Sequence, residues 1–150
     1  MRSLLIAITL FACLSAVGAA QNTPRAAIQV ELNRQKPLHL AVTLKSGSAN
    51  TVTLYHSDLP WGIRDSMTFV AVKPNGEPID LALIADDPGP TQVSLKPREI
   101  LTGDIDLRYV IRDLNVLRKS DVLLFWAYKS PAELQIPRWS GGLIVLPQQK

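Results

Sequence analysis

Short apolar runs with a period of two, separated by Pro, Gly, Asn and Asp, fill most of this 150-residue sequence. A period of two places successive side chains on opposite faces of an extended strand. Many short strands joined by turns are typical of a β-sandwich or a β-barrel. The pattern therefore predicts an all-β domain, and we expect an immunoglobulin-like antiparallel β-sandwich of about seven to nine strands.

The apolar runs predict where the strands lie. They cover residues 27–32, 38–44, 51–56, 66–73, 79–84, 91–95, 100–107, 122–128 and 142–146. The second and third strands flank a polar turn at residues 46–50 and are expected to pair as a hairpin. Asn75-Gly76 lies between the fourth and fifth strands and predicts another hairpin, because Asn-Gly favours the tight turns that join paired strands.

Two of these strands are apolar at nearly every position. Residues 122–128 form a continuous apolar run, which is typical of a central strand covered on both faces. Residues 66–73 are also expected to be buried on much of both faces. Trp126, inside the first of these runs, is expected to pack in the core.

One segment, residues 106–119, has a helical period instead. Its apolar residues have the i, i+3, i+4, i+7 spacing of one helix face and are Leu107, Val110, Ile111, Leu114 and Leu117. Asp106 is suited to cap the N-terminus, and Arg118 and Lys119 lie near the negative C-terminal end. We expect a short helix that crosses between the ends of the sandwich and covers its core.

The first 20 residues have the composition of a signal peptide. Arg2 is followed by an apolar stretch of about a dozen residues, shorter than the about 20 needed to span a membrane, and then by small residues. Cleavage after Ala20 is expected, with Ala19 as an alternative. Lipidation of Cys13 is a further alternative, because residues 10–13 loosely resemble a lipobox. The protein is therefore expected to be exported, either to a periplasm or to the exterior.

The expected domain organisation follows from this cleavage. Residues 21–26 are a polar, flexible leader, residues 27–147 are one sandwich domain, and residues 148–150 are a tail. The only cysteine, Cys13, is removed with the signal. Thiolate metal sites, cysteine nucleophiles and disulfides are thereby excluded from the exported form, and no cofactor is expected.

The charge pattern excludes one class of partner. The net charge of +3 falls to +2 without Arg2, and the charges are spread along the chain. No basic block is interleaved with aromatic residues, so nucleic acid is not an expected partner. No second long apolar run follows the signal, so no membrane association is expected after cleavage.

The turn at residues 94–99, Ser-Leu-Lys-Pro-Arg-Glu, precedes Ile105-Asp106-Leu107 and a last apolar strand. This layout resembles bacterial exported immunoglobulin-like sandwich domains, including the small proteinase-inhibitor domains of bacilli. The resemblance covers residues 27–129 in the order of elements. It implies a domain that binds or inhibits another protein, or serves as a structural module. The match lies in scaffold turns, so it assigns no inhibitory residue.

Residues 55–58, Tyr-His-Ser-Asp, bring together the residue types of a catalytic triad. A small hydrolase built on His56 and Asp58 is one alternative function. Neighbours on a strand point to opposite faces, however, whereas triad members must converge on one reacting atom. The simpler interpretation is a strand end whose Ser57 and Asp58 bond the turn backbone.

Metal sites have weak support. His39 and His56 are the only imidazoles and lack the close spacing of zinc ligands. His39 is expected on a solvated strand face. Two acidic pairs, Asp86-Asp87 and Asp104 with Asp106, could bind calcium, but turn-forming and capping roles explain them more simply.

Two tryptophans are the main candidates for recognition. Trp61 and Trp139 lie in expected loops beside Arg64 and Arg138, and such aromatic and arginine pairs are common anchors of protein interfaces. Alternatively, both rings fold inward and close the open ends of the sandwich. As exposed stacking platforms they would instead indicate a carbohydrate-binding module.

These observations favour an exported, non-catalytic module that binds an extracytoplasmic protein or acts as an inhibitor. The expected binding residues are Tyr55, His56, Asp58, Trp61, Arg64, Arg138 and Trp139. Exposure separates the alternatives. Coplanar, exposed tryptophans would favour sugar, and a pocket joining His56 to carboxylates of other strands would favour catalysis.

Overall fold

The computed structural model describes residues 27–62, 66–82 and 91–149. The expected signal peptide and leader, and Cys13 with them, lie outside these residues. The same is true of Arg64 and of the pair Asp86-Asp87.

Nine strands and one α-helix are described, together with four short 3-10 turns. The strands are β1 (Ile28–Leu32), β2 (His39–Lys45), β3 (Val52–Tyr55), β4 (Met67–Val72), β5 (Pro78–Ile79), β6 (Gln92–Leu95), β7 (Ile100–Asp106), β8 (Val122–Lys129) and β9 (Trp139–Leu146). The helix is α1 (Val116–Lys119), and the 3-10 turns are η1 (His56–Asp58), η2 (Pro60–Gly62), η3 (Leu107–Tyr109) and η4 (Ala132–Leu134).

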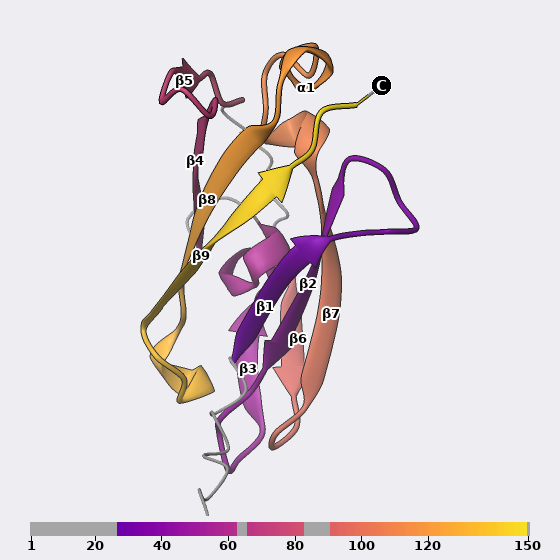
Figure 1. Cartoon of the computed structure of the whole chain (residues 1–150). Helices are drawn as coiled ribbons and strands as arrows, with labels where there is room; N and C mark the ends of the chain where they lie inside the picture. Colours follow the sequence, from indigo (N-terminus) through magenta and orange to yellow (C-terminus); the bar gives the residue numbers. More distant parts are fainter. Residues whose placement is uncertain (1–26, 63–65, 83–90, 150) are drawn as a thin grey trace, which may run out of the picture.

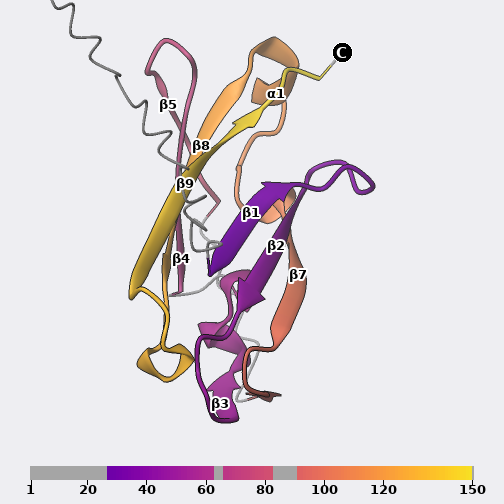
Figure 2. The same ribbon diagram turned by 60° about the horizontal axis from the view of Figure 1, so that its bottom comes forward.

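The strands form three antiparallel sheets. One sheet has the order β5-β4-β8-β9, a second has the order β1-β2-β7, and β3 pairs with β6. In Figure 1 the four-stranded sheet forms the left layer, and β1, β2 and β7 form the right layer; the turned view of Figure 2 shows the same two layers. The expected all-β, sandwich-like fold is confirmed.

The core lies between these two layers because alternate residues of each strand point inward. On β2, Leu40, Val42 and Leu44 are fully buried, as the period of two predicts. The register of β2 with β7 places Leu40 beside Ile105, which is also buried. The largest side chain without solvent exposure is Tyr128 of β8.

One expected hairpin is confirmed and one is wrong. β4 pairs with β5 through the turn at Asn75-Gly76, where Gly76 has a φ of 86° that a glycine adopts without strain. β2 and β3, in contrast, belong to different sheets. The turn between them is held by other segments, since Gly47 donates to the carbonyl of Leu134 at 2.8 Å. This bond holds the turn where the chain passes from one sheet to another.

The expected helix over residues 106–119 is shorter than its apolar pattern indicates. Only η3 and α1 are helical in this segment. Between them, Ile111 forms an isolated β-bridge with Leu81, and Arg112 N–H donates to the Asp80 carbonyl at 3.2 Å. Tertiary pairing and the β-branched Val110 and Ile111 therefore interrupt the helix.

The other features of this segment agree with the sequence. Asp106 caps η3, because its carboxylate accepts a hydrogen bond from the Arg108 N–H. Four residues of the predicted stripe are buried, namely Leu107, Val110, Ile111 and Leu117, and Leu114 is half-buried against the core. The stripe covers the core without a continuous helix.

β9 is longer than expected. It begins at Trp139, so this tryptophan lies in a strand and not in the loop that the sequence predicted. After β9, Gln149 N–H donates to the Leu117 carbonyl and Gln148 N–H donates to the Asp121 carboxylate, both at 2.8 Å. Within the described residues, no helix is both long enough and apolar enough to cross a membrane.

Candidate functional site

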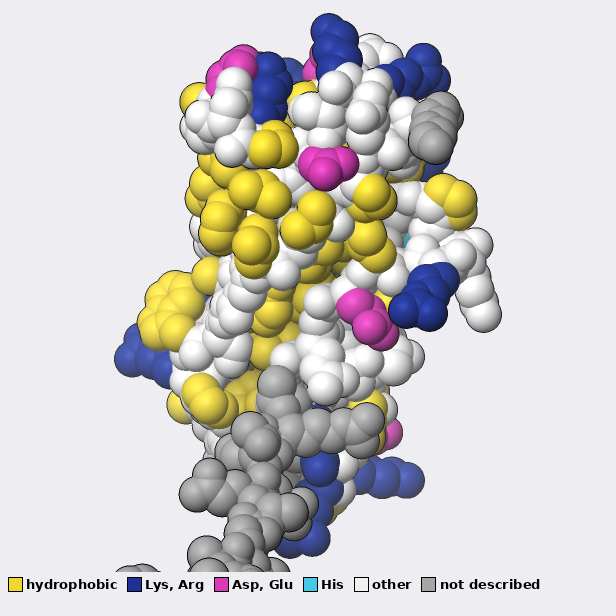
Figure 3. All heavy atoms as spheres, in the orientation of Figure 1, with side chains coloured by type: hydrophobic (Ala, Val, Ile, Leu, Met, Phe, Trp, Pro, Cys, Tyr) yellow, Lys and Arg dark blue, Asp and Glu magenta, His cyan; other side chains and the backbone are white. Residues whose placement is uncertain are grey.

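The outer face of the four-stranded sheet is apolar across three strands. The register places Val70 of β4 beside Phe125 of β8, and Phe125 beside Leu143 of β9. The adjacent row on the same face of the sheet consists of Val72, Leu123 and Val145. We name these six residues the outer apolar face. Figure 3 shows hydrophobic side chains gathered on the side of the molecule where β8 and β9 lie.

Four residues of this face are largely exposed. The exposed fractions are 54% for Val70, 43% for Phe125, 50% for Leu143 and 48% for Val145. The prediction that β8 and β4 are covered on both faces is therefore wrong for their outer sides. Contiguous exposed apolar patches on soluble domains mark surfaces that contact another molecule.

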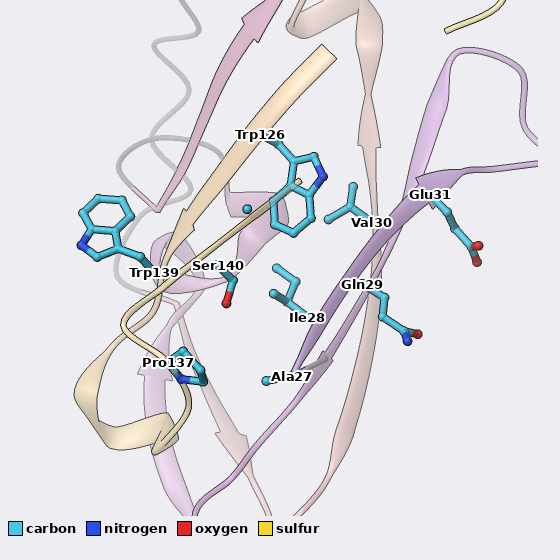
Figure 4. A pocket seen from close by; sticks show the side chains of 10 residues that line it. Ala27, Ile28, Gln29, Val30, Glu31, Trp126, Pro137, Trp139 and Ser140 are labelled. Carbon is cyan, nitrogen blue, oxygen red and sulfur yellow. The ribbon is translucent and has the colours of Figure 1, made fainter. Parts of the chain in front are cut away.

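Trp139 lies at one end of the same side of the sheet. It is 59% exposed and pairs with Lys129 of β8. Figure 4 shows its ring pointing away from the groove between β9 and β1. Arg138, the next residue toward the N-terminus, is exposed, and its carbonyl accepts a hydrogen bond from Ser130 N–H at 2.9 Å. Trp139 and Lys129 thus lie at the border of the outer apolar face, with Ala127 and Gly141 between them and the row of Phe125 and Leu143, and the exposed Arg138 precedes Trp139 in the chain.

A groove separates the edges of the two larger sheets. It has a volume of about 640 Å³ and is lined by residues 27–31 of the β1 region and by Pro137, Trp139, Ser140 and Gly141 of the β9 region. Ile28, Val30 and Trp126 point toward one another inside it (Figure 4). Trp126 is 9% exposed, so it packs in the core as predicted.

Trp61 has a different environment from Trp139. It is half-buried in η2 and packs against the core. A Cβ atom added to Gly103 of β7 would lie 2.2 Å from Cδ2 of Trp61, so the indole lies directly on the glycine backbone. One tryptophan closes the space beside β7 and the other faces solvent. The two rings therefore do not form a shared stacking platform.

The triad-like segment has the local arrangement expected of a turn. The Asp58 carboxylate accepts a hydrogen bond from Tyr55 N–H at 3.0 Å and closes η1. Nδ1 of His56 is buried without a hydrogen-bond partner. Beside Asp58 is a pocket of about 200 Å³, lined by Ser57, Ser66, Lys129, Ser130 and Pro131, and among the described residues that line it Asp58 is the only carboxylate. This pocket does not join His56 to carboxylates of other strands.

Tyr128 connects this turn to the sheet. Its hydroxyl donates to the Asp58 carbonyl at 2.9 Å. Burial raises the pKa of Tyr128 well above its ordinary value, with a further contribution from the negative charge of Asp58. The hydroxyl therefore stays a donor, and η1 is held at the end of β8. Since Lys129 pairs with Trp139, the candidate residues Asp58 and Trp139 lie at the same end of the sheet.

Charged residues lie on the outer face of β1, β2 and β7. Lys36 pairs with Asp104, and Arg108 pairs with Asp106. Hydrogen bonds from Lys36 and Asn33 lower the pKa of Asp104, and a hydrogen bond from Arg108 lowers the pKa of Asp106. The two aspartates therefore remain ionised, each paired with a basic side chain.

His39 belongs to the same face and is less solvated than expected. Its side chain is 23% exposed, its Nδ1 is buried without a partner, and its Nε2 lies 3.8 Å from an Asp106 oxygen. His39 lies on β2, whereas His56 lies in η1, after β3. Among the residues that the structure describes, no three His, Cys, Asp or Glu side chains gather as metal ligands.

Sequence reasoning identified Trp139 but not the outer apolar face that it borders. Tyr55, the remaining candidate, is 50% exposed on β3. The signal for the face was present in the absence of polar residues from residues 122–128 and 143–146. This signal predicted burial on both faces, because the sequence alone does not show whether another part of the chain covers the second face.

Comparison with known proteins assigns no family to this chain. The chain matches no protein-family model and no curated protein.

Proposed function

We propose that this protein is an exported, non-catalytic binding module that recognises an extracytoplasmic protein with its outer apolar face. The observation that supports this proposal most directly is the row Val70, Phe125 and Leu143, which crosses three strands with 43% or more of each side chain exposed. Folding gains nothing from leaving such side chains in water. A partner that covers them supplies the missing burial.

The border of the face suits a protein partner. Interfaces have an apolar centre, a polar rim and an enrichment in Trp and Arg. Here Trp139 and Arg138 lie at the edge, with Lys129 beside them. An exposed sheet face of this kind suits another protein surface, whereas a small molecule usually needs a concave site.

Affinity capture with a surface variant tests this function. The chain from Gln21 onward serves as bait in the extracytoplasmic fraction, beside Phe125→Ser and, as a control, Ile100→Ser. Ile100 is 56% exposed on β7, outside the face. We expect one protein to be retained by the wild type and by Ile100→Ser, and at least about tenfold less by Phe125→Ser, a change of about 1.4 kcal/mol.

The other outcomes are equally informative. Equal retention by all three baits, or no retention, contradicts the proposal. A retained protease that is inhibited by the wild type but not by Phe125→Ser makes the module an inhibitor. Retention of polysaccharide that is lost in Trp139→Ala would favour the carbohydrate-binding alternative.

A further inference from the structure

β9 is the edge strand of the four-stranded sheet and differs in length and composition from the other edge strands. Exposed edges are commonly shortened, charged or interrupted by proline, because their free backbone groups accept other strands. At the opposite edge of this sheet, β5 has two residues, one of which is Pro78. In the three-stranded sheet, β1 carries Glu31, and β7 carries Asp104 and Asp106. β9 has eight residues, no proline and no charge.

The hydrogen-bond pattern shows which backbone groups of β9 face away from β8. Ser130 N–H donates to the Arg138 carbonyl, so position 138 faces β8. Backbone groups alternate sides along an antiparallel strand. The N–H and C=O groups of positions 139, 141, 143 and 145 therefore point away from β8. β1 lies beside this edge, and a groove separates the two strands near Ser140 and Gly141.

These positions are self-complementary at one register. If two β9 strands pair antiparallel about Gly142, Trp139 lies opposite Val145 of the second copy, and Gly141 lies opposite Leu143. All four free positions of each strand are then used, which gives about eight hydrogen bonds. An aromatic residue beside a β-branched one is a favourable cross-strand pair, and Gly141 leaves space for the leucine.

We propose that β9 pairs antiparallel with β9 of a second copy of this chain, about a two-fold axis at Gly142. The pairing joins the two four-stranded sheets edge to edge and places the two outer apolar faces side by side. It leaves those faces uncovered, so the proposal does not depend on the proposed function. No like charges meet along the strand, because β9 has none.

The size of this contact sets the expected affinity. A strand of eight residues is about 26 Å long, and paired strands lie about 4.8 Å apart. This narrow strip is well below the about 800 Å² per partner of standard stable complexes. We therefore expect a weak dimer that forms and dissociates with protein concentration.

Cross-linking at single cysteines tests the register. The chain from Gln21 onward contains every described element and no cysteine. We expect a mixture of Trp139→Cys and Val145→Cys chains to be joined by a short dithiol-reactive cross-linker. Either variant alone should not be joined, because identical positions would be six residues, or about 20 Å, apart. Cross-linking of one variant alone, or none in the mixture, overturns the register.

Sedimentation equilibrium tests the pairing itself. Val145→Pro removes an N–H that points away from β8, so no bond to β8 is lost, and edge strands tolerate proline at such positions. Because this N–H would donate to the second copy, the variant should weaken the dimer at least about tenfold. Val145→Thr, which keeps the N–H, and Phe125→Ser should change dimerisation by less than about threefold, or about 0.7 kcal/mol. Circular dichroism checks that each variant folds. A wild type that stays monomeric, or a Val145→Pro dimer of wild-type affinity, overturns the proposal.

Discussion

The outer faces of the two larger sheets differ in polarity. The outer side of β1, β2 and β7 is polar, with rows such as Glu31, Ala41 and Asp104. The outer side of β4, β8 and β9 has Val70, Phe125 and Leu143 in the equivalent place. Both sheets bury apolar residues inward, so the core does not explain this difference. One sheet presents polar residues to solvent, whereas the other leaves a second apolar face exposed.

The largest expected effect distinguishes the two faces of one strand. Leu124 and Phe125 are neighbours on β8, but Leu124 is fully buried and Phe125 is 43% exposed. Leu124→Ala should lower the free energy of unfolding by about 2–5 kcal/mol through loss of core packing. Phe125→Ala should lower it by no more than about 1 kcal/mol. Urea denaturation measures both, and equal losses would mean that the outer face serves folding.

The inner face of the three-stranded sheet is tested next, at Gly103. An added Cβ meets the Trp61 ring, so Gly103→Ala should destabilise the fold by about 1–3 kcal/mol. In a Trp61→Ala background, where the ring is absent, the same change should cost less than about 0.5 kcal/mol. An equal cost in both backgrounds would show that Trp61 does not rest on Gly103.

The link between the four-stranded sheet and η1 has a smaller expected effect. Tyr128→Phe removes the hydroxyl that donates to the Asp58 carbonyl. We expect thermal or urea unfolding to show a loss of about 1 kcal/mol, the usual net value of one hydrogen bond. Tyr109→Phe is the control, because Tyr109 is 59% exposed. If the two variants lost equal stability, the hydrogen bond of Tyr128 would not hold η1 at the end of β8.

The smallest effect concerns acid and the polar face. The pKa values of Asp104 and Asp106 are lowered in the folded protein. Their stabilisation is therefore present above the ordinary aspartate pKa of about 3.9 and is lost as the pH falls through the lower folded values. A variant with both Asp104→Asn and Asp106→Asn should lose less stability between pH 5 and pH 3 than the wild type. Phe125→Ala, which changes no titratable group, should keep the wild-type slope, and identical slopes for all three proteins would contradict the assignment.

Local patterns predicted much of the fold because local chemistry decides it. The turn at Asn75-Gly76 formed as expected, since glycine tolerates the positive φ of that turn. Asp106 capped the following turn, and β2 buried alternate apolar residues. Strand partners were harder to predict. The polar turn after β2 looked like a hairpin, but backbone bonds to distant segments sent β3 to another sheet.

The candidate site was predicted in part. Trp139 was selected for its neighbour Arg138, and its exposure agrees with a recognition role. Trp61 was selected by the same argument, yet it packs on Gly103, which is 42 residues away along the chain. A pair of adjacent residues cannot report a contact made through folding. The outer apolar face was missed for the same reason, because its rows combine residues from three strands.

By itself, the sequence determined that this chain is built from short antiparallel strands, that it turns at Asn75-Gly76, and that residues 122–128 are apolar on both faces. These properties depend on the conformations and hydropathy of neighbouring residues. Only the tertiary structure decided which strands pair, which tryptophan is exposed, and that the second apolar face of β8 has no cover among the described residues. Burial depends on what packs against a surface, and distant segments of the chain supply that packing.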